Sequence, residues 1–371
     1  MCPIPRDTAI AGAPNNVNAK DASSTCFSCK RLNDSTFQIV EDDKWDEIPI
    51  IYVKIYDMVL VLIDTGCGGA AKDDTAALTS LRKFLETYPV LDNNDTALNP
   101  GSEKGYLVIC SHCHFDHIGG IAQFLDAPKC ALWASSYDRA FVEGDGMLPM
   151  HSLCQYLGMK TPEYKVTVWA EDGQNVIYGP DNSDLGLVIY HTPGHTPDEL
   201  AVWDSRERVL FVGDTMYEWT HIVWPLEGNL LLYSQTMGKL KDLVRSWNSE
   251  IRSTNDGSPY TQLPNVSLLK TTFVGPHSTG SSPQCARVKI ACGHTTSSAD
   301  GEQLLDDVDL FLYHVAEGIV EENPQGTFRD EQLVSYNRED GKISFIGPKK
   351  LFEAFRSDET AMDAIRKRHS G

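Results

Sequence analysis

The chain has 371 residues, enough for one large domain or two ordinary ones, and its 41% hydrophobic and 23% charged residues are typical of a globular protein. Its formal net charge of −20 argues against a nucleic acid or an anionic membrane as a partner. No apolar run approaches the roughly 18 residues that a membrane span needs, and residues 1–16 lack an apolar leader, so we expect a cytoplasmic protein.

The first part of the chain is predicted to contain an arm followed by strands. Residues 1–34 are polar and weakly patterned, which predicts an N-terminal arm. Cys26 and Cys29 form a C-x-x-C pair with no second pair nearby to complete a zinc site, and the ten cysteines are expected to be reduced thiols. Runs rich in β-branched residues predict strands over 36–40, 48–55 and 58–64. Apolar spacing predicts a helix over 75–88 and a short buried strand over 106–110.

The segment "CSHCHFDHIGG" (110–120) follows that buried strand and concentrates ligand-type side chains. They are His112, His114, Asp116 and His117. Because side chains alternate along an extended chain, His112 and His114 point the same way and form a clip for a transition metal. Asp116 and His117 can turn toward a second ion where the chain leaves the extended form, which the following glycine pair permits. Four such residues in six positions argue against a chance polar loop.

Three more ligand-type residues come later, each after an apolar strand and a glycine. They are His195 in "TPGHT", Asp214 in "VGDT" and His294 in "CGHT". The elements predicted in this part are strands at 130–135, 164–170, 185–191, 200–204, 208–213 and 286–292, helices at 233–247 and 302–320, an insertion at 249–284, and a mixed C-terminal segment. Rigid strands can hold such loop-borne ligands in place. Strands arriving in runs before the helices favour a mixed α/β fold over a simple alternating parallel sheet.

These motifs, in this order, resemble those of the metallo-β-lactamase superfamily. "LIDTGCGG" (62–69) resembles the family's first motif, whose aspartate, here Asp64, is an anchor and not a ligand. The resemblance runs from Asp64 to His294. It implies a four-layer αβ/βα sandwich with the metals at one edge between two sheets and a C-terminal helical and mixed extension. We therefore expect residues 35–371 to form one domain with inserts, with 64–294 as its motif core.

The resemblance also implies a dinuclear metal site. His112, His114 and His195 would hold one ion, Asp116, His117 and His294 the other, and Asp214 would bridge them. An aspartate at 214 resembles the glyoxalase-type and lactonase branches, whereas antibiotic-degrading enzymes of the main zinc class have cysteine there. Imidazole and carboxylate ligands suit zinc, although manganese or iron could replace it. Two such ions lower the pKa of a bound water toward about 7 and polarise a substrate carbonyl.

Two residues are expected to act in catalysis beyond binding metal. Asp116 would shuttle a proton from the attacking water to the leaving group. Tyr217, at an offset from Asp214 where the lactonases have a tyrosine, would donate a hydrogen bond to the carbonyl oxygen, and packing is the alternative. Asp64 would orient a ligand histidine, whereas His191 and His221 are interpreted as ordinary histidines. Side chains that either line a pocket or pack in the core are Met147, Met150, Trp219, Trp224 and Tyr233.

The leading functional hypothesis is a hydrolase that opens a cyclic ester, lactam or carbamate. "HSLCQYLG" (151–158) and "HTPDELAVWD" (195–204) resemble fungal-type family members associated with lactam or lactone detoxification, and benzoxazolinone-like lactams are one candidate class. The inserts at 88–105, 142–165 and 249–284 would close a small pocket over the substrate.

The alternative is a thioesterase of glyoxalase or polyketide-releasing type, although this acidic chain offers no obvious basic patch for glutathione or a carrier protein. A nuclease is disfavoured by the charge, and a sulfur dioxygenase would bind one iron. A silent binding module is disfavoured by the complete ligand set. The expected partner is a small-molecule substrate, and the sequence leaves open whether the protein is a homo-oligomer.

Overall fold

The computed structural model describes residues 24–143, 146–255 and 286–370, and its first sheet has seven strands in chain order. The strands are β1 (Phe27–Arg31), β2 (Thr36–Glu41), β3 (Ile50–Ile55), β4 (Val59–Ile63), β5 (Gly105–Ile109), β6 (Cys130–Ser135) and β7 (Val168–Ala170). Strands β1 to β4 are antiparallel, and β4 to β7 are parallel. Because parallel strands end at the same edge, Asp64 after β4 and the 110–120 motif after β5 lie side by side.

The second sheet has six strands in the order β14-β13-β11-β10-β9-β8. They are β8 (Gln174–Tyr178), β9 (Ser183–His191), β10 (Leu200–Asp204), β11 (Val209–Phe211), β13 (Lys289–Ala291) and β14 (Ala299–Asp300). Only β11 and β13 pair in parallel, so Asp214 and His294, which follow them, emerge at the same edge. His195 lies in the turn between β9 and β10.

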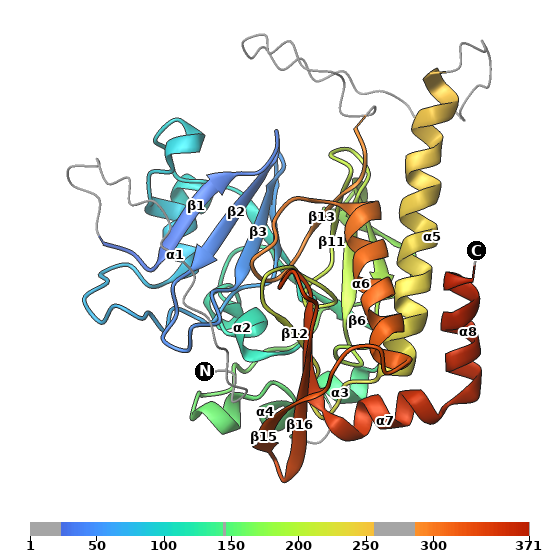
Figure 1. The fold of residues 1–371 in the computed structure, drawn as a ribbon. Coiled ribbons are helices and arrows are strands. Elements are labelled where there is room, and N and C mark those ends of the chain that lie inside the picture. Colours follow the sequence, from blue (N-terminus) through green and yellow to red (C-terminus); the bar gives the residue numbers. More distant parts are fainter. Residues whose placement is uncertain (1–23, 144–145, 256–285, 371) are drawn as a thin grey trace.

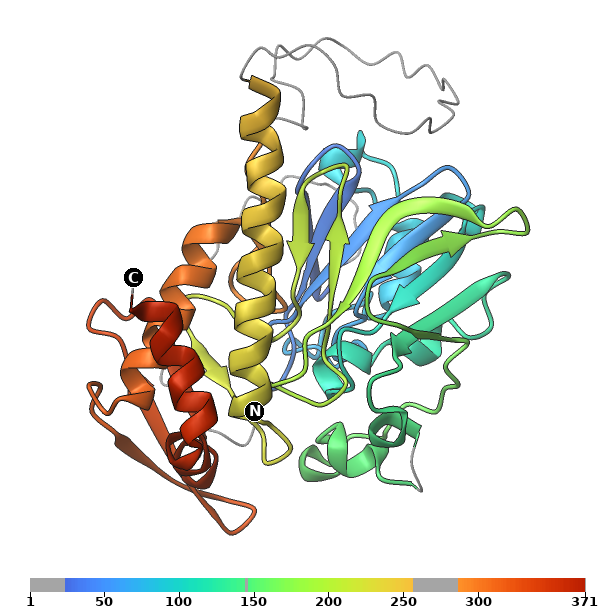
Figure 2. The same cartoon turned by 90° about the vertical axis from the view of Figure 1, so that its right-hand side faces the viewer.

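The two sheets face each other across an apolar core and carry helices on their outer faces (Figures 1 and 2). Tyr52 and Ile109 from the first sheet belong to the same buried cluster as Ile189 and Phe211 from the second. Outside the first sheet lie the short helices α1 (Leu81–Thr87) and α2 (Phe115–Ile118), and outside the second lie α5 (Leu230–Asn255) and α6 (Gly301–Ala316), while α3 (Arg139–Glu143) and α4 (Leu148–His151) lie at the lower end of the sandwich in Figure 1. The predicted four-layer sandwich is confirmed.

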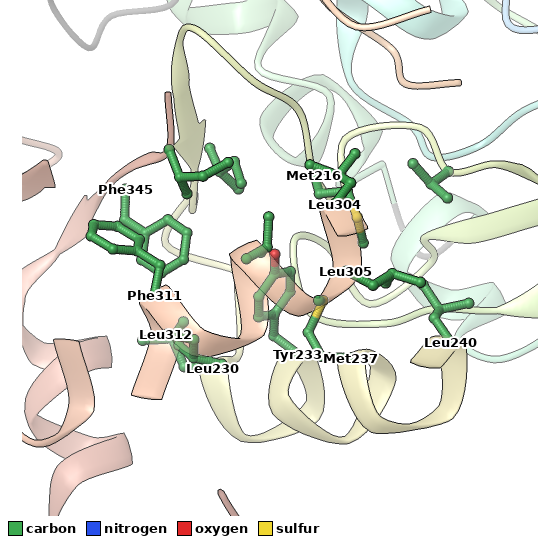
Figure 3. Packing of buried hydrophobic residues seen from close by; sticks show 14 of the residues in the cluster. Met216, Leu230, Tyr233, Met237, Leu240, Leu304, Leu305, Phe311, Leu312 and Phe345 are labelled. Atoms are coloured by element: carbon green, nitrogen blue, oxygen red, sulfur yellow. The ribbon is translucent and has the colours of Figure 1, made fainter. Parts of the chain in front are cut away.

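Helices α5 and α6 cover the second sheet because both are amphipathic. Tyr233 and Met237 on α5 interdigitate with Leu304 and Leu305 on α6 (Figure 3). The side chain of Asp300 caps the first turn of α6 by accepting a hydrogen bond from the Gln303 amide at 3.2 Å. None of the described helices is both long and apolar enough to span a membrane.

A third, four-stranded sheet in the order β12-β17-β16-β15 forms most of the C-terminal extension. Its strands are β12 (His221–Val223), β15 (Asn323–Phe328), β16 (Glu331–Asn337) and β17 (Ser344–Pro348), followed by α7 (Lys349–Ser357) and α8 (Glu359–His369). Strand β12 comes from the middle of the chain and pairs in parallel with β17. The extension is therefore joined to the sandwich through a strand that lies between two ligand-type residues in sequence, Asp214 and His294.

Several predicted elements differ from the structure. The helix predicted at 302–320 ends at Ala316, and the strand predicted at 164–170 is limited to β7. Residues 27–31 of the predicted arm form β1, which is hard to recognise because it is an edge strand with mostly exposed side chains, while residues 1–23 lie outside the described residues. Helix α1 begins after the N-cap Ser80 and not at 75, because the amides of Ala77 and Leu78 bond to Ser24 instead. Helix α5 extends to 255, into the predicted insertion, whose residues 256–284 are not described.

Candidate metal centre

The first cluster of ligand-type side chains consists of His112, His114 and His195, here called the histidine group. Nε2 of His112 lies 3.0 Å from Nδ1 of His114, and Nε2 of His195 lies 3.1 Å from the same atom. All three rings are buried, between 0 and 5% exposed. Three ring nitrogens, one from each histidine, thus converge on one point. Nitrogens that all present lone pairs repel one another, whereas a cation at their centre would accept all three lone pairs.

The outer nitrogens of two of these residues, His195 and His112, are held by protein oxygens. His195 donates from Nδ1 to the Val223 carbonyl at 2.6 Å. Nδ1 of His112 lies 3.1 Å from Ser111 Oγ and 3.3 Å from Oε2 of Glu199. An N–H bond on the outer side leaves the inner nitrogen with a free lone pair, which is the tautomer that a metal ligand requires.

The second cluster, here called the mixed group, consists of Asp116, His117, Asp214 and His294, whose ligand atoms lie within 4.8 Å of one another. Nε2 of His294 is 3.2 Å from Oδ2 of Asp116 and 3.3 Å from Oδ2 of Asp214. Nε2 of His117 is 3.4 Å from Oδ1 of Asp214. These two nitrogens and Asp214 Oδ1 are buried without a hydrogen-bond partner among the described residues. Such convergent, unsatisfied donor atoms fit a divalent cation.

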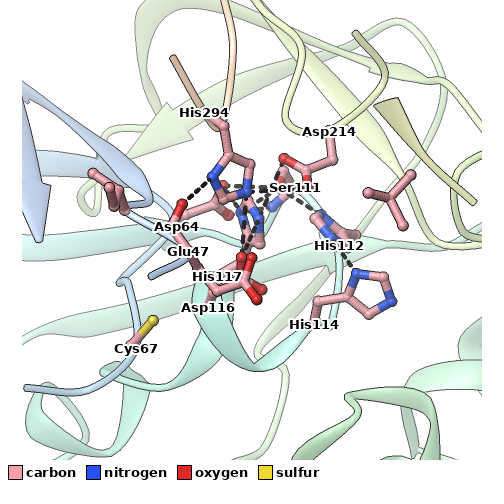
Figure 4. A network of polar contacts seen from close by, with 12 residues as sticks. Glu47, Asp64, Cys67, Ser111, His112, His114, Asp116, His117, Asp214 and His294 are labelled. Atoms are coloured by element: carbon pink, nitrogen blue, oxygen red, sulfur yellow. Dashed lines mark hydrogen bonds and ion pairs between the residues drawn. The ribbon is translucent and has the colours of Figure 1, made fainter. Parts of the chain in front are cut away.

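The mixed group is fastened to the N-terminal half of the chain (Figure 4). His117 donates from Nδ1 to Oδ2 of Asp64 at 2.8 Å, and His294 donates from Nδ1 to the Glu47 carbonyl at 2.8 Å. Asp64 also accepts hydrogen bonds from the amide and hydroxyl of Ser111, at 2.7 and 2.8 Å. It does so from a left-handed backbone conformation with φ of 66°, a strained geometry that these three hydrogen bonds hold in place.

Asp214 lies between the two groups. Besides its contacts in the mixed group, its Oδ2 is 4.0 Å from Nε2 of His195 in the histidine group. Its amide donates to Oε1 of Glu199 at 3.1 Å. A Cβ on Gly213 would overlap Glu199, and one on Gly293 would overlap Asp214, so both glycines that precede ligand-type residues are sterically required. This position between the groups is the one a bridging carboxylate would occupy.

The two groups differ in charge. Burial and the neighbouring rings lower the pKa of all three residues of the histidine group, that of His114 to about 3. In the mixed group burial again favours the neutral ring, but Asp214 and Asp116 outweigh it and raise the pKa of His294 to about 10. The same carboxylates, with Asp64, raise the pKa of His117 well above its usual value despite burial. Without metal, the histidine group is therefore neutral and the mixed group holds protons.

Sequence reasoning missed two buried carboxylates that support the site. Glu199 touches both His112 and the amide of Asp214, and burial raises its pKa. Glu41 accepts hydrogen bonds from the amides of Cys67 and Gly69, both at 2.7 Å, and so fixes the loop that follows Asp64. Both glutamates stand next to apolar strand residues in the sequence, and this could have indicated them. Burying a carboxylate there costs free energy unless a buried partner binds it.

The remaining candidate residues fall into different places. Tyr217 is fully buried, and its ring meets that of His294 edge-on with centroids 5.5 Å apart. Trp224 and Tyr233 pack in the core, while Trp219 and Met147 are exposed and Met150 is half-buried.

The other histidines and the C-x-x-C pair lie outside both groups. His191 bonds to the Ala170 carbonyl at 2.7 Å, as an ordinary structural histidine does, and His221 begins β12. Neither Cys26 nor Cys29 belongs to a candidate metal group in the described part of the chain.

Comparison with known proteins adds a family and several relatives. The sequence model of the metallo-beta-lactamase superfamily matches residues 50–254, more than half of the chain. The protein avaE of Aspergillus versicolor, provisionally named a transcription factor, is 31% identical over 309 residues, which cover 82% of this chain and 81% of avaE.

Several other relatives carry the names of enzymes. The acyl-coenzyme A thioesterase MBLAC2 of Homo sapiens is 27% identical over 196 residues, covering 50% of this chain and 64% of that protein. A hydroxyacylglutathione hydrolase of Gloeobacter violaceus is 27% identical over 173 residues, covering 46% and 57%. The chain thus spans less than two thirds of the length of both named enzymes.

Proposed function

Because the chain belongs to the metallo-β-lactamase superfamily and has the site of a metal-dependent hydrolase, we propose that it opens a cyclic ester, lactam or carbamate by adding water to the ring carbonyl. The observation that carries the proposal is the pair of buried ligand groups with Asp214 between them. We propose zinc as the ion in both groups, since imidazole and carboxylate are its common ligands. A small molecule in the cytoplasm is the proposed substrate.

The chain's own residues would orient the reactants and move the proton. Two divalent ions, when bound, supply an activated water and Lewis acidity toward the carbonyl. Asp116, through the carboxylate oxygen that does not face His294, would accept the proton of the attacking water and pass it to the leaving heteroatom of the ring. Tyr217, held against His294, would donate its hydroxyl proton in a hydrogen bond to the carbonyl oxygen as negative charge develops there.

Charge favours a small neutral substrate. Two cations of the C-terminal extension, Lys342 and Arg329, pair with acids in the segment that follows Asp214. Lys342 lies 2.8 Å from Glu218, four residues after Asp214, and 3.2 Å from Asp307. Arg329 lies 2.6 Å from Glu227. With a net charge of −20 around them, these ion pairs offer little attraction to a polyanion such as a coenzyme A thioester. A benzoxazolinone-like lactam carries no such charge.

Thioester hydrolysis is the second candidate. It is favoured by the two relatives that are named as a thioesterase and a hydroxyacylglutathione hydrolase. The same ligand groups and the same role of Asp116 serve either reaction, because both add water to an acyl carbonyl. A thioesterase would need an additional cationic surface for its carrier.

The name given to avaE suggests transcriptional regulation, and we do not extend it to this chain. Binding to DNA depends on neutralising phosphates with lysine and arginine. A chain with 52 acidic and 32 basic residues is poorly suited to that task.

The test is a substrate panel with purified, zinc-loaded protein and a metal-free control. We expect lactones, lactams or cyclic carbamates to be hydrolysed without an organic cofactor, with one solvent oxygen in the new acid. His114→Ala should abolish the activity, whereas His314→Ala, which changes a half-buried histidine on α6 outside both groups, should preserve it. Turnover of glutathione or coenzyme A thioesters alone would replace the proposal with the second candidate.

A further inference from the structure

The ligand-type histidine His195 lies in the β9–β10 turn of the sandwich, but the outer nitrogen of its ring bonds to the C-terminal sheet. Its Nδ1 donates to the carbonyl of Val223, the last residue of β12, at 2.6 Å. Strand β12 belongs to neither sandwich sheet, and its strand partner is β17, with Val223 opposite Ile346. The hydrogen bond that fixes this ring therefore depends on β12, and β12 is held in turn by β17, which lies about 120 residues after it in the sequence.

The join between β12 and β17 is tightly packed. The Trp224 amide donates to the Ile346 carbonyl at 2.8 Å, and the buried Trp224 ring meets Phe345 edge-on with centroids 4.8 Å apart. Gly347 lies directly against Trp224, where an added Cβ would be 3.0 Å from its Cβ and 3.2 Å from its carbonyl oxygen. Shifts in β17 are therefore transmitted to β12, because close-packed groups have no space to absorb them.

The segment after β12 also returns to the loop that carries His195. The Asn229 amide donates to the Gly194 carbonyl at 2.8 Å. A Cβ on Gly228 would lie 3.2 Å from the carbonyl oxygen of His195, so the two segments are in close contact. The ring and the backbone of His195 are thus both positioned by residues 223–229.

The outer nitrogens of the mixed group bond elsewhere, although Thr295, next to His294, donates to the Glu218 carbonyl at 2.6 Å in the segment before β12. The outer nitrogen of His117 bonds to Asp64, and that of His294 bonds to the Glu47 carbonyl, both in the N-terminal half. A displacement of β12 should therefore affect one group before the other.

We propose that the C-terminal sheet controls metal binding by the histidine group, with Val223 as a positioning residue that acts through its carbonyl on His195. The inference rests on the proposed metal-dependent function, but it concerns ion affinity and not substrate. Loss of an outer hydrogen-bond partner of a metal-ligating histidine lowers metal affinity by about 10- to 100-fold. Loosening the β12–β17 join should produce a loss of this kind in the histidine group alone.

The experiment is a zinc titration of the full-length, metal-free protein in competition with a chromogenic chelator, which yields two dissociation constants. The variants His114→Ala and His117→Ala assign each constant to its group. Gly347→Ala adds a methyl group against Trp224 at a position without a positive φ, so the backbone tolerates it. We expect its histidine-group constant to rise about 10- to 100-fold and its mixed-group constant to stay within about twofold.

A milder variant and a matched control accompany it. Ile346→Val removes one methylene from a cluster shared with Val223 and Leu333, should fold like the wild type, and should weaken the histidine group severalfold. Tyr336→Phe on β16, a strand separated from β12 by β17, keeps the ring opposite Phe345 and removes only a hydroxyl, which lies 2.9 Å from Glu322 and 3.0 Å from Arg356. It should leave both constants unchanged.

Unchanged constants in both Gly347→Ala and Ile346→Val would overturn the proposal, and so would an equal weakening of both groups. Failure of the proposed function gives a different pattern. The β17 variants would then still weaken zinc binding in the histidine group alone, but none of the cyclic substrates would be hydrolysed. A wild-type protein that binds no zinc would overturn both.

Discussion

The histidine group and the mixed group lie side by side, yet they differ in chemistry and in attachment. The first has three neutral imidazoles, and His195 is held through β12 by the C-terminal sheet. The second combines two imidazoles with two carboxylates and is held by Asp64 and Glu47 from the N-terminal half. The site, with Asp214 between the two groups, is thus assembled from two separately supported halves. We therefore expect single substitutions to weaken metal binding in one half and not in the other.

The largest expected effect comes from removing a ligand in either group. His195→Ala should leave about one zinc ion per chain in the mixed group, and His117→Ala about one in the histidine group, because each group retains its other ligands. Both variants should lose turnover, since the proposed reaction needs both ions. Metal analysis and turnover of the best substrate measure this. A ligand variant that keeps two ions and full activity would show that the group is not a metal site.

A smaller loss is expected from Tyr217→Phe, which tests whether the mixed group has a catalytic neighbour. The variant should keep both metal ions and lower kcat by roughly a hundredfold at most, because one hydrogen bond to the developing oxyanion is lost. KM should change less than kcat, since that bond strengthens in the transition state. Wild-type kinetics would assign the residue to packing against His294.

Asp64→Asn should sharpen the contrast in attachment. Asparagine tolerates the left-handed backbone at this position, so the fold should persist. The loss of carboxylate charge beside Nδ1 of His117 should weaken zinc binding by the mixed group about 10- to 100-fold. The histidine group should change little in the same chelator competition. Equal weakening of both groups would mean that Asp64 supports the loop as a whole.

The smallest expected effect is a difference in proton release. With the pKa of His114 lowered to about 3, the histidine group is already deprotonated above pH 5 and should bind zinc with an affinity that is flat from pH 5 to 8. With the pKa of His294 raised to about 10 and that of His117 raised well above its usual value, the mixed group holds protons at neutral pH that it must lose to bind. Its affinity should fall at least about tenfold for each pH unit lost. Calorimetric titration in two buffers of different ionisation enthalpy measures this, and equal proton release from both groups would contradict it.

Much of the fold followed from local patterns in the sequence. Residues 130–135 form β6 as expected, and the strands before His195, Asp214 and His294 lie where apolar runs predicted them. Each candidate ligand lies within one of the two clusters, because the spacing of strand, glycine and ligand is a local property. The family resemblance is confirmed by the superfamily match.

The supporting residues could not be predicted because their partners are distant in sequence. Glu199 meets His112, which lies 87 positions earlier, and His294 meets the Glu47 carbonyl across 247 positions. The pairing of β12 with β17 was equally hidden, since a three-residue strand has almost no pattern of its own. Edge strand β1 was missed for a similar reason, with only Phe27 of its five residues buried.

The most direct test of a two-part metal hydrolase is activity measured against zinc content. Metal-free protein is reconstituted with increasing zinc, and the hydrolysis of the best cyclic substrate is followed at each step. We expect little activity at low occupancy and a plateau near two ions per chain, with His195→Ala and His117→Ala inactive at every ratio. Full activity in protein that holds no transition metal, or a plateau that both ligand variants also reach, would contradict it.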